Sequence, residues 1–242
     1  MQDRGWWWYD FLLVTGDAYV DHPSFGAAII CRVLEAEGFR VAVLAQPDYK
    51  STDDFRRFGK PRLGFLVTAG NVDSMVAHYS VSRHRRGYDY YSPNGKMGLR
   101  PDRATIVYSN CIRQAYGDVP IILGGLEASL RRFAHYDYWD DKVRRSILID
   151  SGADILSYGM GENSMREICR RLKKKEDPRS MTNIRGTAVM VDDASQLPEN
   201  TKAFNFNLYE DGDNWWSIEL VATDRFDVLD QDWACDEIAD FG

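Results

Sequence analysis

Residues whose side chains could bind a ligand or take part in a reaction recur directly after short apolar runs of the sequence. The first such stretch holds Asp17, Asp21, His22 and Ser24. His22 can change charge near neutral pH, and Ser24 could cap a helix that follows it. Because a helix amino terminus attracts anions, this stretch could form a ligand site. The alternative is that Asp17 and Ser24 only cap the turn while His22 packs.

Other apolar runs end in glycine. Gly124–Gly125 precedes Glu127, and Gly159–Glu162 has the form Gly-x-Gly-Glu. Backbone N–H groups can approach a ligand closely at glycine, and Glu162 could bond ribose hydroxyls. Glycines also permit tight turns for purely steric reasons, so both explanations stay open. The candidates for a ligand cleft are Asp17, Asp21, His22, Ser24, Gly70, Asn71, Gly124, Gly125, Glu127, Gly159, Gly161 and Glu162.

A basic and aromatic stretch occupies the middle of the chain. Interleaved Arg and Tyr can bind a phosphate backbone and stack bases. We expect a solvated loop, or one docked on a neighbouring domain, rather than a nucleic-acid site. Residues 135–145 are expected to be a helical region and an interface in which Asp and Arg pair. The basic-loop candidates are Arg83, Arg85, Arg86, Lys96, Arg100 and Arg103.

The four cysteines, Cys31, Cys111, Cys169 and Cys235, are far apart in sequence. They have no metal-knuckle spacing, so no metal site is predicted in this chain. Cys31 and Cys169 fall on apolar helix faces and are expected to be buried free thiols of a reduced compartment. No apolar run approaches the roughly 20 residues that cross a bilayer, and Asp10 interrupts the apolar start. A cytoplasmic location without membrane partners is therefore expected.

The elements that must position these residues alternate between apolar runs and helical patterns. Runs that are apolar throughout are typical of strands buried on both faces of a parallel sheet. Gly38 is placed to end the first helix, and Ser164–Glu167 forms a capping box for the last one. We therefore predict an α/β fold with a doubly wound, mostly parallel, Rossmann-like or cobalamin-domain-like sheet, in which ligands bind beyond the carboxyl strand ends. The predicted strands are residues 11–15, 41–44, 63–68, 104–108, 119–123, 153–158 and 186–191.

The end of the chain differs in charge and pattern. Residues 1–191 hold 28 Lys and Arg against 23 Asp and Glu, whereas residues 192–242 hold 2 against 14. Apolar residues alternate with polar ones on both sides of Asp211–Asn214, which is a hairpin turn signal. We predict an α/β domain over residues 1–191 and an acidic segment over residues 192–242 that contains a separate antiparallel hairpin.

These motifs, in this order, resemble the amino-terminal domain of the YgiQ-type radical-SAM family. The resemblance covers residues 4–191. The stretches that carry it are DFLLVTGDAYVDHPSFGAAIICRVLEAEGFRV, AQPD, PRLGFLVTAGNVDSMV, YSPNGKMGLRPDRATIVYSN, DVPIILGGLEASLRRFAHYDYWDDKVRRSILIDSGADILSYGMGEN and IRGTAVM.

The resemblance implies a domain that precedes a radical-SAM barrel. In the family that barrel binds a four-iron cluster, through Cys-x-x-x-Cys-x-x-Cys, and S-adenosylmethionine. This chain lacks the motif, so neither cofactor is expected here, and the barrel of the full-length protein is the expected partner.

A more distant resemblance is to cobalamin-binding domains, which share Gly-Gly and Gly-x-Gly-Glu. Those that ligate cobalt use Asp-x-His-x-x-Gly, whereas here Asp21 and His22 are adjacent and Gly26 is one place late. This spacing argues against His22 as a cobalt ligand, although cobalamin remains a candidate.

Two functions stay open. The chain is an accessory domain of a radical-SAM protein, inert alone, or a self-standing module that binds a small molecule, a corrinoid or nucleic acid. A hydrolase built on Asp21, His22 and Ser24 would lack a recognisable oxyanion donor and third triad member. The strand-end loops are expected to converge on one cleft, either a concave pocket or a flat apolar docking face, and we favour docking.

Overall fold

The computed structural model describes residues 4–196, 198, 202–209 and 215–222, and the backbone alone for the last two ranges. The strands are β1 Phe11–Thr15, β2 Val41–Ala45, β3 Gly64–Thr68, β4 Ile121–Leu123, β5 His135–Asp137, β6 Lys142–Arg144, β7 Ile155–Ser157, β8 Thr187–Val191, β9 Lys202–Tyr209 and β10 Trp215–Ala222. The α-helices are α1 Gly26–Ala36, α2 Asp53–Arg56, α3 Ser74–His78, α4 Ala104–Tyr116, α5 Gly125–Leu130, α6 Ile147–Ser151 and α7 Glu162–Lys173.

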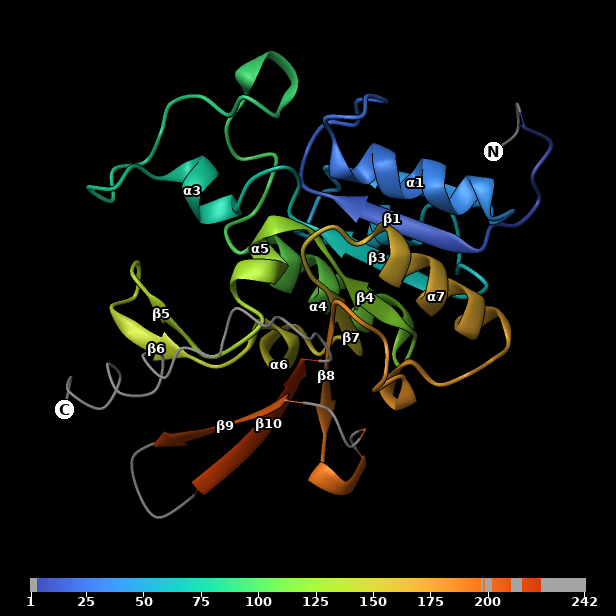
Figure 1. Cartoon of the computed structure of the whole chain (residues 1–242). Coiled ribbons are helices and arrows are strands. Elements are labelled where there is room, and N and C mark those ends of the chain that lie inside the picture. The colour runs from blue at the N-terminus through green and yellow to red at the C-terminus, as the bar shows by residue number, and fades with distance from the viewer. Residues whose placement is uncertain (1–3, 197, 199–201, 210–214, 223–242) are drawn as a thin grey trace.

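One large sheet organises the chain, in the order β2-β1-β3-β4-β7-β8-β10-β9 (Figure 1). The five strands from β2 to β7 run parallel, and β8, β10 and β9 continue the sheet antiparallel. Phe11 of β1 aligns with Val41 of β2 on one side and with Gly64 of β3 on the other. The α/β fold with a mostly parallel sheet is confirmed.

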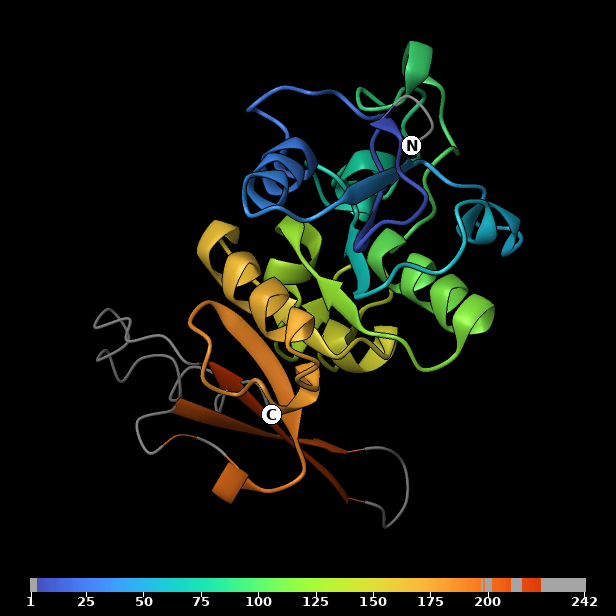
Figure 2. The same ribbon diagram turned by 90° about the vertical axis from the view of Figure 1, so that its right-hand side faces the viewer.

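Helices cover both faces of this sheet. Figure 2 shows α1 and α7 on one side, with α2 and α4 on the other. Residues of β1 alternate between the two cores, so that Leu12 and Val14 pack toward α4, while Phe11 and Leu13 pack toward α1 and α7. All five residues of β1 are buried, which explains why the first four, Phe11 to Val14, are apolar without alternation.

Several local predictions were wrong. Residues 104–108 begin helix α4 instead of forming a strand, because side chains from distant segments cap this helix (below). Helix α1 begins after Phe25, so Ser24 does not cap it. Ser164 lies inside α7, where its hydroxyl bonds Ser157 instead of capping the helix.

Other predictions at segment ends have mixed outcomes. Residues 135–145 form the β5–β6 hairpin instead of a helical region. Gly38 does follow α1 as predicted, in the left-handed region at φ 83°. The antiparallel hairpin of the acidic segment is present as β9 and β10, but it is not separate, because β10 pairs with β8. The division of the chain at residue 191 stays a prediction.

Candidate functional site

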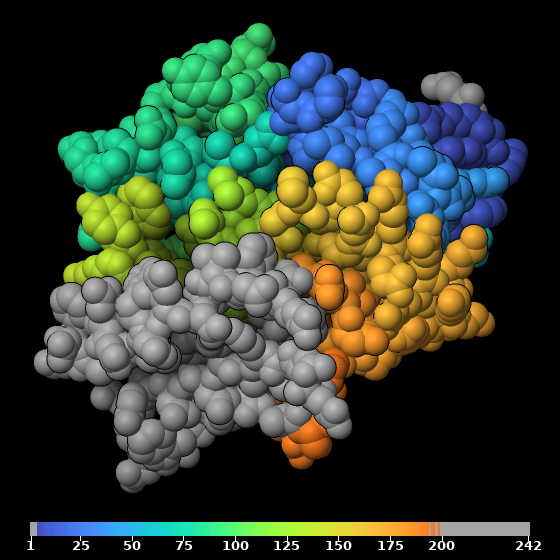
Figure 3. Space-filling view, in the orientation of Figure 1, coloured from blue at the N-terminus to red at the C-terminus, as the bar shows by residue number. Residues whose placement is uncertain are grey.

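A cavity of about 250 Å³ opens where the parallel strands end. It is lined from β1, β3, β4 and β7, and by residues of α1, α5 and α7. The chain order reverses between β1 and β3, and such switch points are where doubly wound sheets bind ligands. Figure 3 shows the surfaces of α1, in blue, and α7, in gold, side by side on the face turned toward the viewer. The lining residues are Leu13, Gly26, Ala27, Ile29, Ile30, Leu66, Val67, Thr68, Gly70, Ile122, Leu123, Gly124, Gly125, Ser157, Gly159, Met160, Gly161, Glu162 and Met165.

The predicted cleft residues divide into those that line this cavity and those that do not. The structure brings six of them together at the cavity wall. Asp17 and Asn71 border an adjacent hollow of only about 10 Å³. Asp21, His22, Ser24 and Glu127 reach neither space. The six that line the cavity are Gly70, Gly124, Gly125, Gly159, Gly161 and Glu162.

Gly125 shows why glycine is needed in one of these loops. Its φ is 84°, a conformation that residues with a side chain rarely adopt. A Cβ there would also lie 2.3 Å from the Thr68 hydroxyl oxygen. The tight passage from β4 into α5 therefore depends on glycine at this position for steric reasons, whatever binds nearby.

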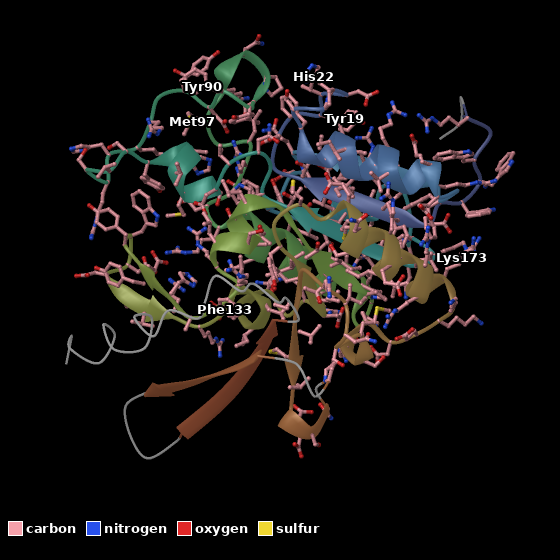
Figure 4. The ribbon with its side chains drawn as sticks, viewed as in Figure 1. Tyr19, His22, Tyr90, Met97, Phe133 and Lys173 are labelled. Carbon is pink, nitrogen blue, oxygen red and sulfur yellow. The ribbon has the colours of Figure 1, made fainter. Side chains whose placement is uncertain are left out.

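The loop after β1 is held by its neighbours. Asn71 donates to the backbone oxygen of Ser24 and accepts from the N–H of Gly26, which ties this loop to the one after β3. Asp21 pairs with Arg32 of α1. His22 lies on the outer side of the loop (Figure 4), where its Nδ1 accepts from the Ser24 N–H at 3.1 Å. Asp21 and His22 therefore do not form a pair that faces the cavity.

A buried ion cluster fixes the carboxyl end of β1. Arg100 is fully buried and donates to Asp17 at 2.8 Å, to both oxygens of Asp89 at 2.8 Å, and to the backbone oxygen of Ala69. Asp17 also accepts from the Asn71 N–H at 2.6 Å. Arg100 is thus a structural cation that holds the 88–100 segment on the sheet edge, rather than an exposed phosphate ligand.

The two carboxylates of this cluster share one guanidinium and differ in pKa. Burial raises the pKa of Asp17 to about 6, against the smaller effects of Asn71 and Arg100. Burial also opposes ionisation of Asp89, but the paired hydrogen bonds from Arg100 hold its pKa below the ordinary value. Asp17 therefore carries the surplus negative charge of the cluster.

This difference predicts opposite effects for two matched substitutions. Because the pKa of Asp17 is higher in the folded state than in the unfolded state, Asp17 contributes to the free energy of unfolding below pH 4. This contribution is lost as the pH rises through 6. We expect Asp17→Asn to raise the free energy of unfolding at pH 7.5 by about 1–3 kcal/mol, and to flatten its decline between pH 4 and 7. Urea denaturation at several pH values measures this.

Asp89→Asn provides the matched control. We expect it to destabilise the chain at pH 7.5, because Asp89 is the ionised partner that Arg100 needs. If Asp17→Asn is less stable than the unsubstituted chain at pH 7.5, the assignment of the surplus charge to Asp17 is wrong.

Glu127 has a structural position that the sequence did not indicate. Its side chain is 1% exposed and accepts hydrogen bonds from two helix starts. One oxygen accepts from the Ser74 N–H of α3 at 2.8 Å, and the other from the Thr105 N–H of α4 at 2.9 Å. Such N–H groups have no partner within their own helices. Glu127 therefore joins α3, α4 and α5.

The basic-loop candidates do not form one surface. Arg83, Arg85, Arg86 and Lys96 are exposed, and Arg83 lies over the Tyr138 ring at 4.6 Å. Arg86 donates to backbone oxygens of Val76 and Tyr79, which shapes the loop. Figure 4 shows Tyr90 and Met97 on the outer part of this segment.

Arg103 belongs instead to a clamp on the β5–β6 hairpin. It pairs with Asp137 at 2.7 Å and with Asp140 at 3.0 Å, and Arg144 also pairs with Asp137. Burial opposes ionisation of Asp137, but Arg103 lowers its pKa to about 2. The predicted pairing of Asp and Arg in this region is confirmed, within a hairpin.

The three described cysteines are buried and free, as predicted for Cys31 and Cys169. Burial raises the pKa of Cys31 to about 12 and also raises that of Cys169, so both remain thiols. They lie on α1 and α7, while Cys111 lies on α4 across the sheet. These thiols do not fit a four-iron cluster, which needs several thiolates at one place. Cys235 lies outside the described residues.

Sequence reasoning missed the apolar walls of the cavity and the role of Asp89. Leu13, Ile30 and Met165 line the cavity, but in the sequence they are ordinary core positions. Asp89 has no local signal, because its partner Arg100 reaches it only through the folded loop. The described helices include none that is long and apolar enough to cross a membrane.

Comparison with known proteins gives the family. The sequence matches the family described as Radical SAM N-terminal over residues 1–228. A UPF0313 protein of Clostridium perfringens strain SM101 is 58% identical over 199 residues, which is 82% of this chain and 30% of that protein. A UPF0313 protein of Clostridium botulinum type A is 58% identical over 190 residues, 78% of this chain and 30% of that protein. This chain thus spans about 30% of the length of these curated relatives, and by its match over residues 1–228 it belongs to the Radical SAM N-terminal family.

Proposed function

We propose that this chain is an accessory domain whose carboxyl strand edge docks on the radical-SAM barrel of a longer protein. The observation that carries the proposal is the distribution of exposed apolar side chains. Of the sixteen large apolar side chains exposed among the described residues, twelve lie in the segments that follow the carboxyl ends of β1, β3, β4 and β7, and Trp7, Trp8, Phe58 and Met190 lie elsewhere. The twelve are Tyr19, Val20, Val76, Val81, Tyr88, Tyr90, Leu126, Leu130, Tyr136, Tyr138, Val143 and Met160.

Exposure on this scale is costly unless a partner covers it. The side chain of Tyr90 is 84% exposed, and that of Met160 is 91% exposed. Large apolar side chains that are exposed together in one region of a folded domain commonly mark an interaction site. The remaining length of the relatives, about 70% of each protein, supplies the proposed partner. Family membership implies that this remaining part binds a four-iron cluster and S-adenosylmethionine. The domain formed by this chain would dock on that part and cover its surface.

Hydrogen–deuterium exchange tests the docking. We expect amides of residues 76–90 and 126–145 to exchange at least about tenfold more slowly in the full-length Clostridium perfringens relative than in this chain, after correction for sequence. Residues 53–60, at the opposite strand edge, provide the control and should exchange alike in both. Equal exchange of the edge segments in the two proteins would contradict docking.

Ligand binding is the second candidate function, and the cavity favours it. A docking face alone would be flat, but this edge contains a hollow of about 250 Å³ beside the apolar residues. His22 does not line it, so a corrinoid held through His22 has no support from the geometry.

A further inference from the structure

The geometry points to the cavity between α1 and α7 as a binding site for a neutral, nucleoside-like molecule, with a flat aromatic ring inside and hydroxyl groups beside Glu162. This inference goes beyond docking and does not depend on it. It rests on the open space, the wall chemistry and two glycines that nothing else in the fold explains.

First, the cavity is large enough for a small molecule, and much of its lining is apolar. Leu13, Leu66 and Ile122 come from the sheet, and Ile30 and Met165 come from the flanking helices. A volume of about 250 Å³ equals about eight waters at about 30 Å³ each, yet an apolar wall offers these waters few hydrogen bonds. The apolar faces of an aromatic ring that displaced them would be favoured.

The second step concerns Gly26 and Gly124, which both line the cavity. Neither has a positive φ, and Gly124 has an extended φ of −157° that any residue adopts. A Cβ at Gly26 would meet nothing within 4 Å, and at Gly124 only an ordinary contact at 3.8 Å. The backbone and its packing therefore do not require glycine here. The lack of a side chain leaves space inside the cavity instead.

The third step is the polar end. Glu162 is the one ionisable side chain among the described residues that line the cavity, and no Lys, Arg or His balances it there. It opens α7, whose first N–H groups receive no side-chain cap. A carboxylate acceptor beside free N–H donors suits a group that both donates and accepts, which is what a hydroxyl does. A phosphate would face Glu162 without a cation, so the neutral nucleoside is favoured over a nucleotide.

Adenosine is the probe for the test, titrated into the full chain by calorimetry. We expect Gly124→Val and Gly26→Val to weaken adenosine binding by about tenfold or more, because they fill the cavity. Gly87→Val is the matched control, since Gly87 also has an open Cβ position but lies outside the cavity. It should leave the affinity unchanged. Thermal unfolding of each variant shows that the fold is kept.

The ribose contact has its own test. We expect 2′,3′-dideoxyadenosine, which lacks both ribose hydroxyls, to bind the unsubstituted chain about fivefold more weakly than adenosine does. In the Glu162→Gln variant the two ligands should bind with nearly equal affinity. Adenosine monophosphate should bind more weakly than adenosine. The inference is overturned if adenosine fails to bind at millimolar concentration, if Gly124→Val binds it as well as Gly87→Val does, or if the monophosphate binds more tightly. None of these results bears on the exchange test of docking.

Discussion

Replacing Arg100 with methionine is expected to lower the free energy of unfolding by about 3–5 kcal/mol. The substitution keeps most of the side-chain length but leaves Asp17 and Asp89 buried and facing each other without a cation. Breaking a buried ion pair by removing one partner has this magnitude, because an unpaired charge stays in a low-dielectric site. Urea denaturation at pH 7.5 measures the change, with Arg85→Met as the exposed control.

A compensated variant separates charge from packing. Arg100→Met combined with Asp17→Asn and Asp89→Asn should recover much of the lost stability, because the triple variant buries no unpaired charge. If Arg100→Met alone stays within about 1 kcal/mol of the unsubstituted chain, Arg100 does not hold the loop as described. Failure of the triple variant to recover would assign the loss to packing of the Arg100 side chain.

Replacing Glu127 with glutamine is expected to lower the free energy of unfolding by about 2–4 kcal/mol, which is the second large effect. The amide keeps one acceptor oxygen, but its NH₂ group would face a helix N–H that the carboxylate now satisfies. The cost combines the loss of one charge-assisted hydrogen bond with a buried donor that faces another donor. Thermal or urea unfolding gives the loss of stability.

Glu162→Gln is the matched control, because Glu162 also lies in the first turn of a helix that follows glycine, but it does not cap a distant helix. Its substitution should change stability by less than about 0.5 kcal/mol. Glu127→Gln should also speed amide exchange at the starts of α3 and α4, where the hydrogen bonds are lost. Equal stability of the two variants would show that Glu127 is not the joint between these helices.

The central strands could be predicted because each is buried on both faces. A strand such as Phe11–Thr15 is then apolar on both faces, from Phe11 to Val14, and the run is visible in the sequence. Residues 104–108 show the limit of that signal. A short apolar run is compatible with a buried strand and with a buried helix. Here the helix forms because the side chains of Ser74 and Glu127, from other segments, cap the start of α4.

Charge in the sequence had a similar limit. Arg100 and Arg103 counted toward a basic loop because both follow the arginine-rich stretch at 83–86, which includes His84. In the folded chain Arg100 is buried against Asp17, 83 residues away, and Arg103 clamps Asp137, 34 residues away. A sequence shows that a cation is present, but its partner depends on which segments the fold brings together.

The sequence by itself determined the α/β fold, the family and the gathering of loops at one sheet edge. This follows because parallel strands, buried on both faces, must deliver their carboxyl ends to the same edge. Only the tertiary structure decided what each loop residue does there. In the folded chain Gly124, Gly161 and Glu162 line the cavity. Asp17 is buried against Arg100, and Glu127 accepts hydrogen bonds from the starts of two helices. The physical reason is that burial and hydrogen bonding of a loop side chain depend on partners that lie tens of residues away, which local sequence patterns do not specify.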